Sequence, residues 1–524
     1  MRHYFPGIIA LWLIFQLSSA TAQQDEVIKE IVRIGQTDNQ TMNHLDILTN
    51  RFGGRLLGSD AYENAANWCA TMFRKWGMEV IMDEVGTLPV GFNRGPWFGR
   101  MLSEEGMTLH FATPSYTSGT HGVQRGPVMM EPKTQAEFDR MKGALKGAWV
   151  LISGTNTGWP VDWSERGDSI RMKIIAENEE IARKNRAITE ENRKNPGNES
   201  KPLLPLKEEP ALFYRQMREA GILGIIQSSP VPIRVLYDRN NLEKMTFDML
   251  PTVPDIKLDE HQYKVIEQMV KERRYFLLEF DIRNYFKMGP VPYHNVIGII
   301  RGTEFPDEYV IMGGHLDAFD LATGGVDDGS GITPAMEAAR LIMAAGGRPK
   351  RSILVTLWAG EEFGLWGSKN WVEKNKDKLE RISNYFNRDG GPTVASSLTV
   401  PEAMYGDFVK VCEPLNSINP EFPFTLNKRT EAPKPRPTMA GGSDHAYFAM
   451  NGVPTLTFGT PDLKGYDFNY GEIWHTERDT YDKSIPAYQK QTSIVTAVVV
   501  YGLANLDHLL SRKDLYGEEA LESK

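Results

Sequence analysis

The sequence is poor in cysteine and has no excess of positive charge. Its 524 residues include two cysteines, Cys69 and Cys412, too few and too far apart for a disulfide framework or a cysteine zinc site. We expect both to be buried apolar side chains, although their pairing is left open. Lys and Arg number 59 against 68 Asp and Glu, so the formal net charge of −9 argues against a nucleic-acid partner.

Long apolar runs are also scarce. The run at residues 8–17 is too short to cross a bilayer, and the A-x-A pattern of Ala20 and Ala22 follows it. This pattern predicts a signal peptide over residues 1–22 and a secreted or periplasmic protein. A second apolar stretch, residues 494–506, ends in polar residues, and we expect a helix packed against a sheet. No membrane span is therefore predicted after removal of the signal peptide.

Composition otherwise favours a globular protein with several packed units. Hydrophobic residues make up 41% and charged residues 24%, which is far from fibrous or disordered composition. Apolar spacing at residues 26–52 and 61–76 predicts helices, with Ser59 capping the second. Helical spacing is lost between residues 89 and 126, where Gly, Pro, Ser and Thr accumulate. The predicted units after the signal peptide are residues 23–114, 115–250 and 251–524.

Short β-rich runs alternate with helices from about residue 255, a pattern typical of an α/β sheet with parallel strands. The strands expected there are residues 295–300, 309–312, 352–357, 381–386 and 455–458. In the preceding unit we expect strands at 148–152 and 222–227, with an exposed, highly charged helix between them at 171–195. Ligands of open α/β sheets bind beyond the carboxyl ends of the strands, which is where polar side chains gather in this sequence.

Two imidazoles and three carboxylates stand near these predicted strand ends: His315, Asp327, Glu362, Asp389 and His475. Each residue alone is explained as readily by a structural role, but their joint occurrence favours a metal site. Such donors without thiolate suit Zn²⁺, with Mn²⁺ or Co²⁺ as weaker candidates, and a carboxylate can bridge two ions about 3.5–4 Å apart. The pattern predicts a two-zinc hydrolase in which the remaining acid, Glu361, takes a proton from bound water.

Six motifs, GGHLD, VDDGSG, AGEEFG, NRDGG, GGSDHAYF and WHTERDT, occur in this order and resemble those of the co-catalytic zinc exopeptidases. The stretch NRFGGRLLGS at residues 50–59 is most similar to the carboxypeptidase Q branch of that family. The resemblance implies an α/β fold with a mixed, mostly parallel sheet and flanking helices. It further implies a β-rich domain, similar to protease-associated domains, inserted at residues 115–250.

The resemblance also implies a role for each candidate site residue. One zinc would be held by His315 and Asp389, the other by Glu362 and His475, and Asp327 would bridge them. Asp317 would orient His315, and Glu361 would be the general base and acid acting with a zinc-bound hydroxide. The peptide bond between Asp327 and Asp328 is expected to be cis. Some relatives have a tyrosine before the last histidine, whereas this chain has Trp474, so the oxyanion donor is not identified.

The function implied is a secreted zinc-dependent exopeptidase that hydrolyses dipeptides or terminal residues of short peptides. A carboxypeptidase Q-like dipeptidase is favoured, and an aminopeptidase is the alternative. From other classes, a glutaminyl-cyclase-like acyl transferase is disfavoured by the insertion, and a non-catalytic receptor-like ectodomain by the intact ligands. Short peptides are the expected partners, and a homodimer is left open.

Which substrate terminus is recognised also stays open. A carboxylate would need a cation, and four arginines near the motifs are candidates: Arg388, Arg429, Arg436 and Arg478. An ammonium group would need a carboxylate, for which Asp444 or Asp320 could serve. His445 is expected to be structural because five ligands are already assigned.

Overall fold

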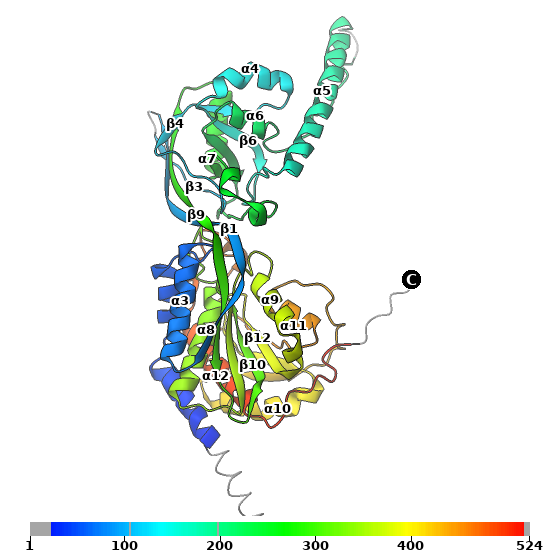
Figure 1. Cartoon of the computed structure of the whole chain (residues 1–524). Helices are drawn as coiled ribbons and strands as arrows, with labels where there is room; N and C mark the ends of the chain where they lie inside the picture. The colour runs from blue at the N-terminus through cyan, green and yellow to red at the C-terminus, as the bar shows by residue number, and fades with distance from the viewer. Residues whose placement is uncertain (1–22, 104–105, 196–198, 518–524) are drawn as a thin grey trace, which may run out of the picture.

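The computed structural model describes residues 23–103, 106–195 and 199–517, which form an upper and a lower lobe (Figure 1). Two long strands, β1 (Glu79–Leu102) and β9 (Leu277–Ile300), pair with each other and run through both lobes. The predicted signal peptide lies outside the described residues. Among the residues that are described, no helix combines the length and apolar character needed to span a membrane.

The lower lobe is built on one mixed sheet. Across it the strands run in the order β12 (Ile382–Asn387), β10 (Phe305–His315), β11 (Arg351–Trp358), β9 and β1, and short strands β2 (Met107–Thr108) and β4 (Gln124–Gly126) join β1 and β9 in the upper lobe. Strand β10 is parallel to β11 and β12, whereas β9 is antiparallel to β11 and β1. The predicted mixed α/β architecture is confirmed. Within this sheet, parallel pairing is confined to the three strands whose carboxyl ends carry candidate ligands.

Helices cover both faces of this sheet (Figure 1). One face packs against α3 (Asp60–Lys75), α8 (Gly329–Ala344) and α12 (Pro486–Ala504), and the other against α9 (Trp366–Lys374) and α11 (His445–Met450). Helix α2 (Thr41–Asp46) packs on α8 and α12. Residues 23–37 are helical, η1 (Ile47–Arg51) extends α2, and α10 (Glu402–Cys412) packs on α12. The Ser59 hydroxyl accepts from the Tyr62 N–H at 3.0 Å, as expected for the cap of α3.

Each face of the sheet is covered by its own hydrophobic cluster. Helix α12 is buried along most of its length. The expectation that the apolar stretch near residue 500 packs against a sheet is therefore confirmed. Cys69 and Cys412 are both buried, free thiols. Burial raises the pKa of the Cys412 thiol to about 12, which keeps it in the neutral form.

The expected strand at residues 455–458 is wrong. Only Phe458 lies in a strand, β15 (Phe458–Gly459), which pairs with β13 (Ser397–Val400), itself paired with β14 (Thr425–Lys428). The preceding residues lie beside β12 without a regular ladder, because Pro454 has no N–H to donate. The Asn384 side chain takes over the pairing: its amide bonds both the N–H and the carbonyl of Leu456, at 2.9 and 3.1 Å.

The upper lobe contains a second sheet. Its strands are β3 (Phe111–Ala112), β8 (Asp255–Asp259), β7 (Gly224–Ser229), β6 (Trp149–Thr155) and β5 (Val128–Met130), flanked by α4 (Gln135–Leu145), α6 (Tyr214–Glu219) and α7 (Glu260–Lys271). The four strands from β8 to β5 are parallel, and a hydrophobic cluster covers each face. Strands were expected at β6 and β7. The sheet also takes in β3 and β8, so this lobe reaches beyond residues 115–250 on both sides.

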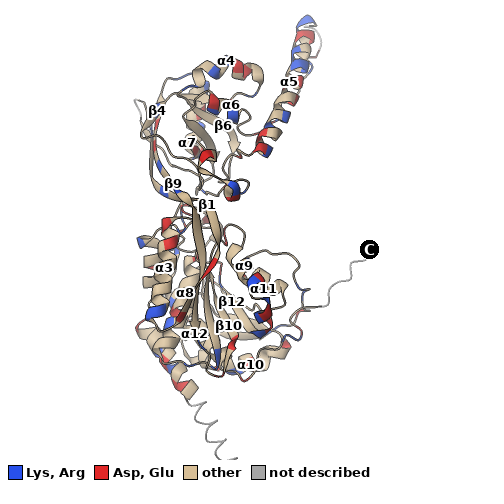
Figure 2. Cartoon of the chain, in the orientation of Figure 1, with Lys and Arg blue, Asp and Glu red and all other residues tan. Residues whose placement is uncertain are grey.

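The expected charged helix is present as α5 (Glu165–Lys194), which projects from the upper lobe and carries both signs of charge along its length (Figure 2). An extended segment runs back along it. Asn178, Asn185 and Asn192, seven residues apart, each pair through the side-chain amide with both backbone groups of one residue in the segment, at 2.8–2.9 Å. Seven helical residues advance about 10.5 Å, close to the roughly 9–10 Å covered by three extended residues, so the two repeats stay in register.

Candidate metal centre

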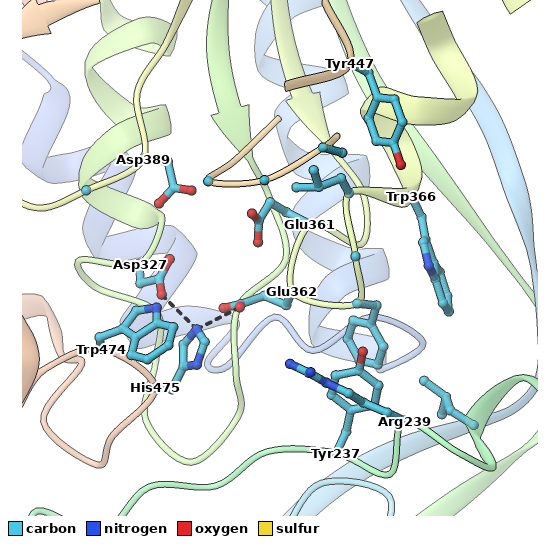
Figure 3. Close-up of a pocket in the computed structure, with 18 of the residues that line it drawn as sticks. Tyr237, Arg239, Asp327, Glu361, Glu362, Trp366, Asp389, Tyr447, Trp474 and His475 are labelled. Carbon is cyan, nitrogen blue, oxygen red and sulfur yellow. Dashed lines mark ion pairs between the residues drawn. The ribbon is translucent and has the colours of Figure 1, made fainter. Parts of the chain in front are cut away.

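The candidate ligands converge at the carboxyl ends of the three parallel strands. His315 is the last residue of β10, Glu361 and Glu362 follow β11, and Asp389 follows β12. A cavity of about 920 Å³ lies between the loops that carry the candidate ligands and the upper lobe (Figure 3). It is lined by Glu361 and by four of the candidate ligands, Asp327, Glu362, Asp389 and His475. The site forms because the three strands are parallel, so that the loops at their carboxyl ends meet at one edge of the sheet.

His315 is buried and held in one orientation. Its Nδ1 lies 2.9 Å from the backbone carbonyl of Asp317. A carbonyl oxygen only accepts, so Nδ1 carries a proton and, in the neutral imidazole, Nε2 presents a lone pair. Nε2 points at two carboxylates, with Asp327 Oδ1 at 3.2 Å and Asp389 Oδ1 at 3.8 Å. These three side chains are the group expected to hold one ion.

His475 faces a second pair of carboxylates. Its Nε2 lies 2.9 Å from Glu362 Oε2 and 3.3 Å from Asp327 Oδ2. Each oxygen of Asp327 therefore faces a different imidazole, which is the arrangement that a bridging carboxylate needs. The peptide bond that follows Asp327 is cis, as expected. The assignment of individual ligands to each ion stays a prediction.

Asp317 contributes in two ways. Its backbone carbonyl, and not its carboxylate, orients His315, because the carboxylate Oδ1 is 3.8 Å from the imidazole. The carboxylate instead accepts from the N–H groups of Gly360, Glu361 and Glu362 at 2.8, 3.1 and 3.2 Å. Burial raises the pKa of Asp317, and these three donors oppose that shift. Asp317 thereby holds the loop that presents both glutamates.

Glu361 faces the cavity without a close ion-pair partner among the described residues (Figure 3). Its carboxylate does lie within 4.8 Å of ligand atoms of His315 and Asp389, so distance alone fits a ligand as well as a base. Burial raises the pKa of Glu361, and the neighbouring carboxylate of Glu362 raises it further. A carboxyl group of this kind can take up and release a proton inside the cavity.

The donor set fits a zinc ion. Asp327 Oδ2 and Glu362 Oε1 are buried and have no hydrogen-bond partner among the described residues, although buried polar atoms are normally paired. Burial lowers the pKa of His315, but contacts with Asp327 and Asp389 outweigh it and raise the pKa well above its usual value. The cluster therefore favours positive charge at its centre. Imidazole and carboxylate donors without thiolate are a set that zinc accepts.

Two buried residues that sequence reasoning missed support the ligand loops. Arg55 donates to the backbone carbonyls of Leu316, Thr323 and Gly324 at 2.7, 2.9 and 3.0 Å. Asp479 Oδ1 accepts from the N–H of Val326, next to Asp327, at 2.6 Å. Both residues belong to motifs identified from the sequence, NRFGGRLLGS and WHTERDT. Their place in these motifs was the one indication in the sequence that they support the site.

The upper lobe supplies one wall of the cavity. Tyr237, Arg239, Leu242 and Glu243 line it, and the Tyr237 ring lies 4.3 Å from that of Phe363, the residue after Glu362. Trp474 lines it as well, so the residue that stands in place of tyrosine reaches the cavity. Sequence reasoning missed this wall because residues 237–243 belong to another predicted unit.

None of the residues considered for recognition of a substrate terminus lines this cavity. They are Arg388, Arg429, Arg436, Arg478, Asp320 and Asp444. The half-buried Arg388 donates to backbone carbonyls of the Asp389 loop, and Arg478 pairs with Glu472 at 2.6 Å. Asp320 pairs with Arg94 at 2.9 Å. His445 is absent from the groups of side chains whose ligand atoms lie within 4.8 Å of one another, which are His315, Glu361 and Asp389, and His315, Asp327 and Glu362.

Comparison with known proteins agrees with this site. Residues 295–499 match the sequence profile of Peptidase family M28. The carboxypeptidase Q of Mus musculus is 22% identical over 513 residues, which cover 95% of this chain and 93% of that protein. The structure of a peptidase M28 precursor from Shewanella amazonensis superimposes with a TM-score of 0.56 at 20% identity, covering 94% and 98% of the two chains. A zinc aminopeptidase from Bacillus subtilis gives 0.51 at 16% identity, covering 91% and 97%.

The two solved structures show that the fold is shared. Fold, site and family match together confirm the predicted class of enzyme, a zinc metallo-exopeptidase. The match of residues 295–499 to Peptidase family M28 confirms the resemblance stated from the motifs.

Proposed function

We propose that the protein is a two-zinc exopeptidase that hydrolyses dipeptides or terminal residues of short peptides, with carboxypeptidase Q-like dipeptidase activity favoured. One observation carries this proposal: the two oxygens of Asp327 face different imidazoles, and Glu361 stands beside them in the same cavity. The similar proteins act at chain ends, since they are named a carboxypeptidase and an aminopeptidase.

The residues that would hold the ions are those already brought together. His315 and Asp389 would bind one zinc, Glu362 and His475 the other, and Asp327 both. Bound zinc would act as a Lewis acid towards the scissile carbonyl and would lower the pKa of a water ligand to about 7.

The protein's own side chains would do the remaining work. Glu361 would take the proton of the attacking water and return it to the nitrogen of the leaving amine. Asp317 keeps Glu361 in place through the backbone N–H of that loop, and His315 keeps a single tautomer through the Asp317 carbonyl. The wall formed by the upper lobe would restrict the cavity to short peptides, which is the role we propose for the domain inserted in the peptidase.

Product analysis by mass spectrometry tests the proposal. Zinc-loaded mature protein is incubated with unblocked dipeptides and with their N-blocked and C-amidated forms. We expect cleavage of the unblocked dipeptides and about two zinc ions per chain, the number such paired carboxylate sites hold. Cyclisation of N-terminal glutamine with one tightly held zinc would indicate an acyl transferase instead. Binding of zinc without any reaction would indicate a receptor-like protein.

We propose further that residues 1–22 form a signal peptide, which makes the protein secreted or periplasmic. The short apolar run and the A-x-A pattern support this. N-terminal sequencing of the exported protein should begin at Gln23, whereas a chain that keeps its first residues would contradict the proposal.

A further inference from the structure

The cavity has one positively charged side chain on the wall that the upper lobe supplies. Among the described residues that line the cavity, Arg239 is the sole lysine or arginine. The metal-ligand side carries carboxylates, and Glu243 adds another on the same wall as Arg239. Figure 3 shows the Arg239 side chain extending into the cavity on the side of Glu362 and His475. A substrate at the proposed metal centre would therefore come within reach of a guanidinium group.

Arg239 is exposed and lines the cavity, and within the described part of the chain no carboxylate lies within ion-pair distance of it. Its guanidinium carbon lies 4.2 Å from the ring centroid of Trp159 and beside the hydroxyl of Tyr237. The aromatic face supports the side chain and leaves the N–H groups at the edge of the guanidinium plane able to donate.

The backbone beneath Arg239 is held in a defined turn. The buried carboxylate of Asp238 accepts from the N–H groups of Asn240 and Asn241 at 2.9 and 3.2 Å and from the Asn241 amide at 2.6 Å. Leu236, two residues before Asp238, bonds Ser115 and Gly158 through its backbone. An anchored turn lowers the entropy lost when the side chain binds a ligand.

The turn is also fixed relative to the metal centre. The Tyr237 ring packs at 4.3 Å against Phe363, which directly follows Glu362, and at 6.3 Å against Phe319. Arg239 therefore reaches the cavity from a segment that touches the glutamate loop itself. This contact fixes the position of Arg239 relative to the glutamate loop. Arg239 can therefore set the distance between a charged group of the substrate and the scissile bond.

We infer that Arg239 binds the free α-carboxylate of the substrate, so that the enzyme acts on peptides with an unblocked C-terminus. The inference rests on the proposed exopeptidase function. A carboxylate is the one anion present in every unblocked peptide, and it matches the fork of a guanidinium in a bidentate pair. Among the described residues that line the cavity, Arg239 is the one lysine or arginine that can donate to this carboxylate, because the carboxylates opposite are those assigned to zinc.

The experiment compares an unblocked dipeptide with its C-amidated form. Wild type, Arg239→Gln and Arg239→Lys are measured together with Glu243→Gln, a matched control from the same wall. We expect Arg239→Gln to raise KM for the free dipeptide and to lower kcat/KM roughly 10- to 100-fold, the size expected for loss of charge-assisted hydrogen bonds. Cleavage of the amide should change little, Arg239→Lys should be intermediate, and zinc content should match wild type in all variants.

The outcomes separate this inference from the proposed function. If wild type cleaves the dipeptide and Arg239→Gln keeps the full preference for the free C-terminus, the carboxylate assignment is wrong while the exopeptidase stands. An equal fall in kcat/KM for the free and the amidated dipeptide in Glu243→Gln, with Arg239→Gln unchanged from wild type, would overturn it as well and would point to recognition of the substrate ammonium group. A wild-type protein that holds zinc and cleaves neither substrate would refute both the function and the inference.

Discussion

Glu361 and Glu362 are neighbours in the sequence, but the structure gives their carboxylates different surroundings. The Glu362 carboxylate lies 2.9 Å from Nε2 of His475, whereas Glu361 faces the cavity. Asp317 accepts from the N–H groups of both residues, so the backbone positions of the two are tied together. Two adjacent acids can thus serve as a ligand and as a proton carrier, because the side chains alternate in direction from a shared anchor.

Exchanging one acid at a time separates the two roles. Glu361→Gln should lose about two to four orders of magnitude in kcat, the range for loss of a general acid or base, and should keep its zinc. Glu362→Ala should lose zinc on dialysis, because a ligand has been removed. Steady-state kinetics and elemental analysis measure both. Full activity in Glu361→Gln would refute the base assignment, and unchanged zinc in Glu362→Ala would refute the ligand.

At the scale of elements, the loop that carries His475 is held by the upper lobe. Glu477 pairs with Ile233 through two bonds, backbone N–H to carbonyl at 3.0 Å and side chain to N–H at 3.1 Å, and the Val235 N–H donates to the His475 carbonyl at 3.4 Å. His475 itself has φ of 59°, a conformation that residues other than glycine rarely adopt. The neighbouring contacts must therefore hold it, and several come from a segment more than 200 residues away in the chain.

Glu477 is accordingly a positioning residue for His475. Glu477→Ala removes the side-chain contact to Ile233 and should weaken zinc binding about 10- to 100-fold, as residues that orient metal ligands typically do. Competition titration against a chelator measures the affinity, and circular dichroism checks the fold. Glu472→Ala is the control, since Glu472 is an acid on the same loop that pairs with the exposed Arg478. Equal zinc affinity in Glu477→Ala and wild type would contradict this role.

At the scale of the whole molecule, one histidine ties the two lobes together. His110 lies beside β3 and contacts Glu477 at 2.7 Å with Nε2 and Asp259 at 3.1 Å with Nδ1. The bond with Glu477 raises the pKa of His110 to about 9; burial opposes this shift, and the Asp259 carboxylate adds to it. A protonated imidazole thus links the end of β8 to the loop that carries a metal ligand.

This pKa makes stability depend on pH with a definite sign. His110 binds its proton more tightly in the folded protein than in the unfolded chain, where its pKa is about 6.5. Its contribution should be complete below that value and should be lost as pH rises towards 9. The fall in Tm over this range should be smaller in His110→Gln than in wild type, as differential scanning calorimetry would measure. Parallel Tm profiles for the two proteins would show that His110 makes no such contribution.

Much of the fold was predictable where local pattern decides structure. Strands β10, β11 and β12 are short apolar runs that end in glycine-rich loops, and α12 contains an apolar run that ends in polar residues. The strand expected at residues 455–458 failed because a run of β-branched and apolar residues favours a strand, yet the side chain of Asn384 occupies its pairing groups. Local preference could not anticipate a partner 72 residues away.

The sequence by itself determined the candidate ligands, their order along the chain and the kind of metal they suit, because these depend on side-chain chemistry at strand ends. It did not reveal Arg55, Arg239 or Glu477, and it offered arginines for substrate recognition that lie away from the cavity. Only the tertiary structure decided which charged groups face the proposed metal centre. The reason is physical: the upper lobe packs its turns against the ligand loops, and contacts between segments so distant in the chain leave no local pattern in either one.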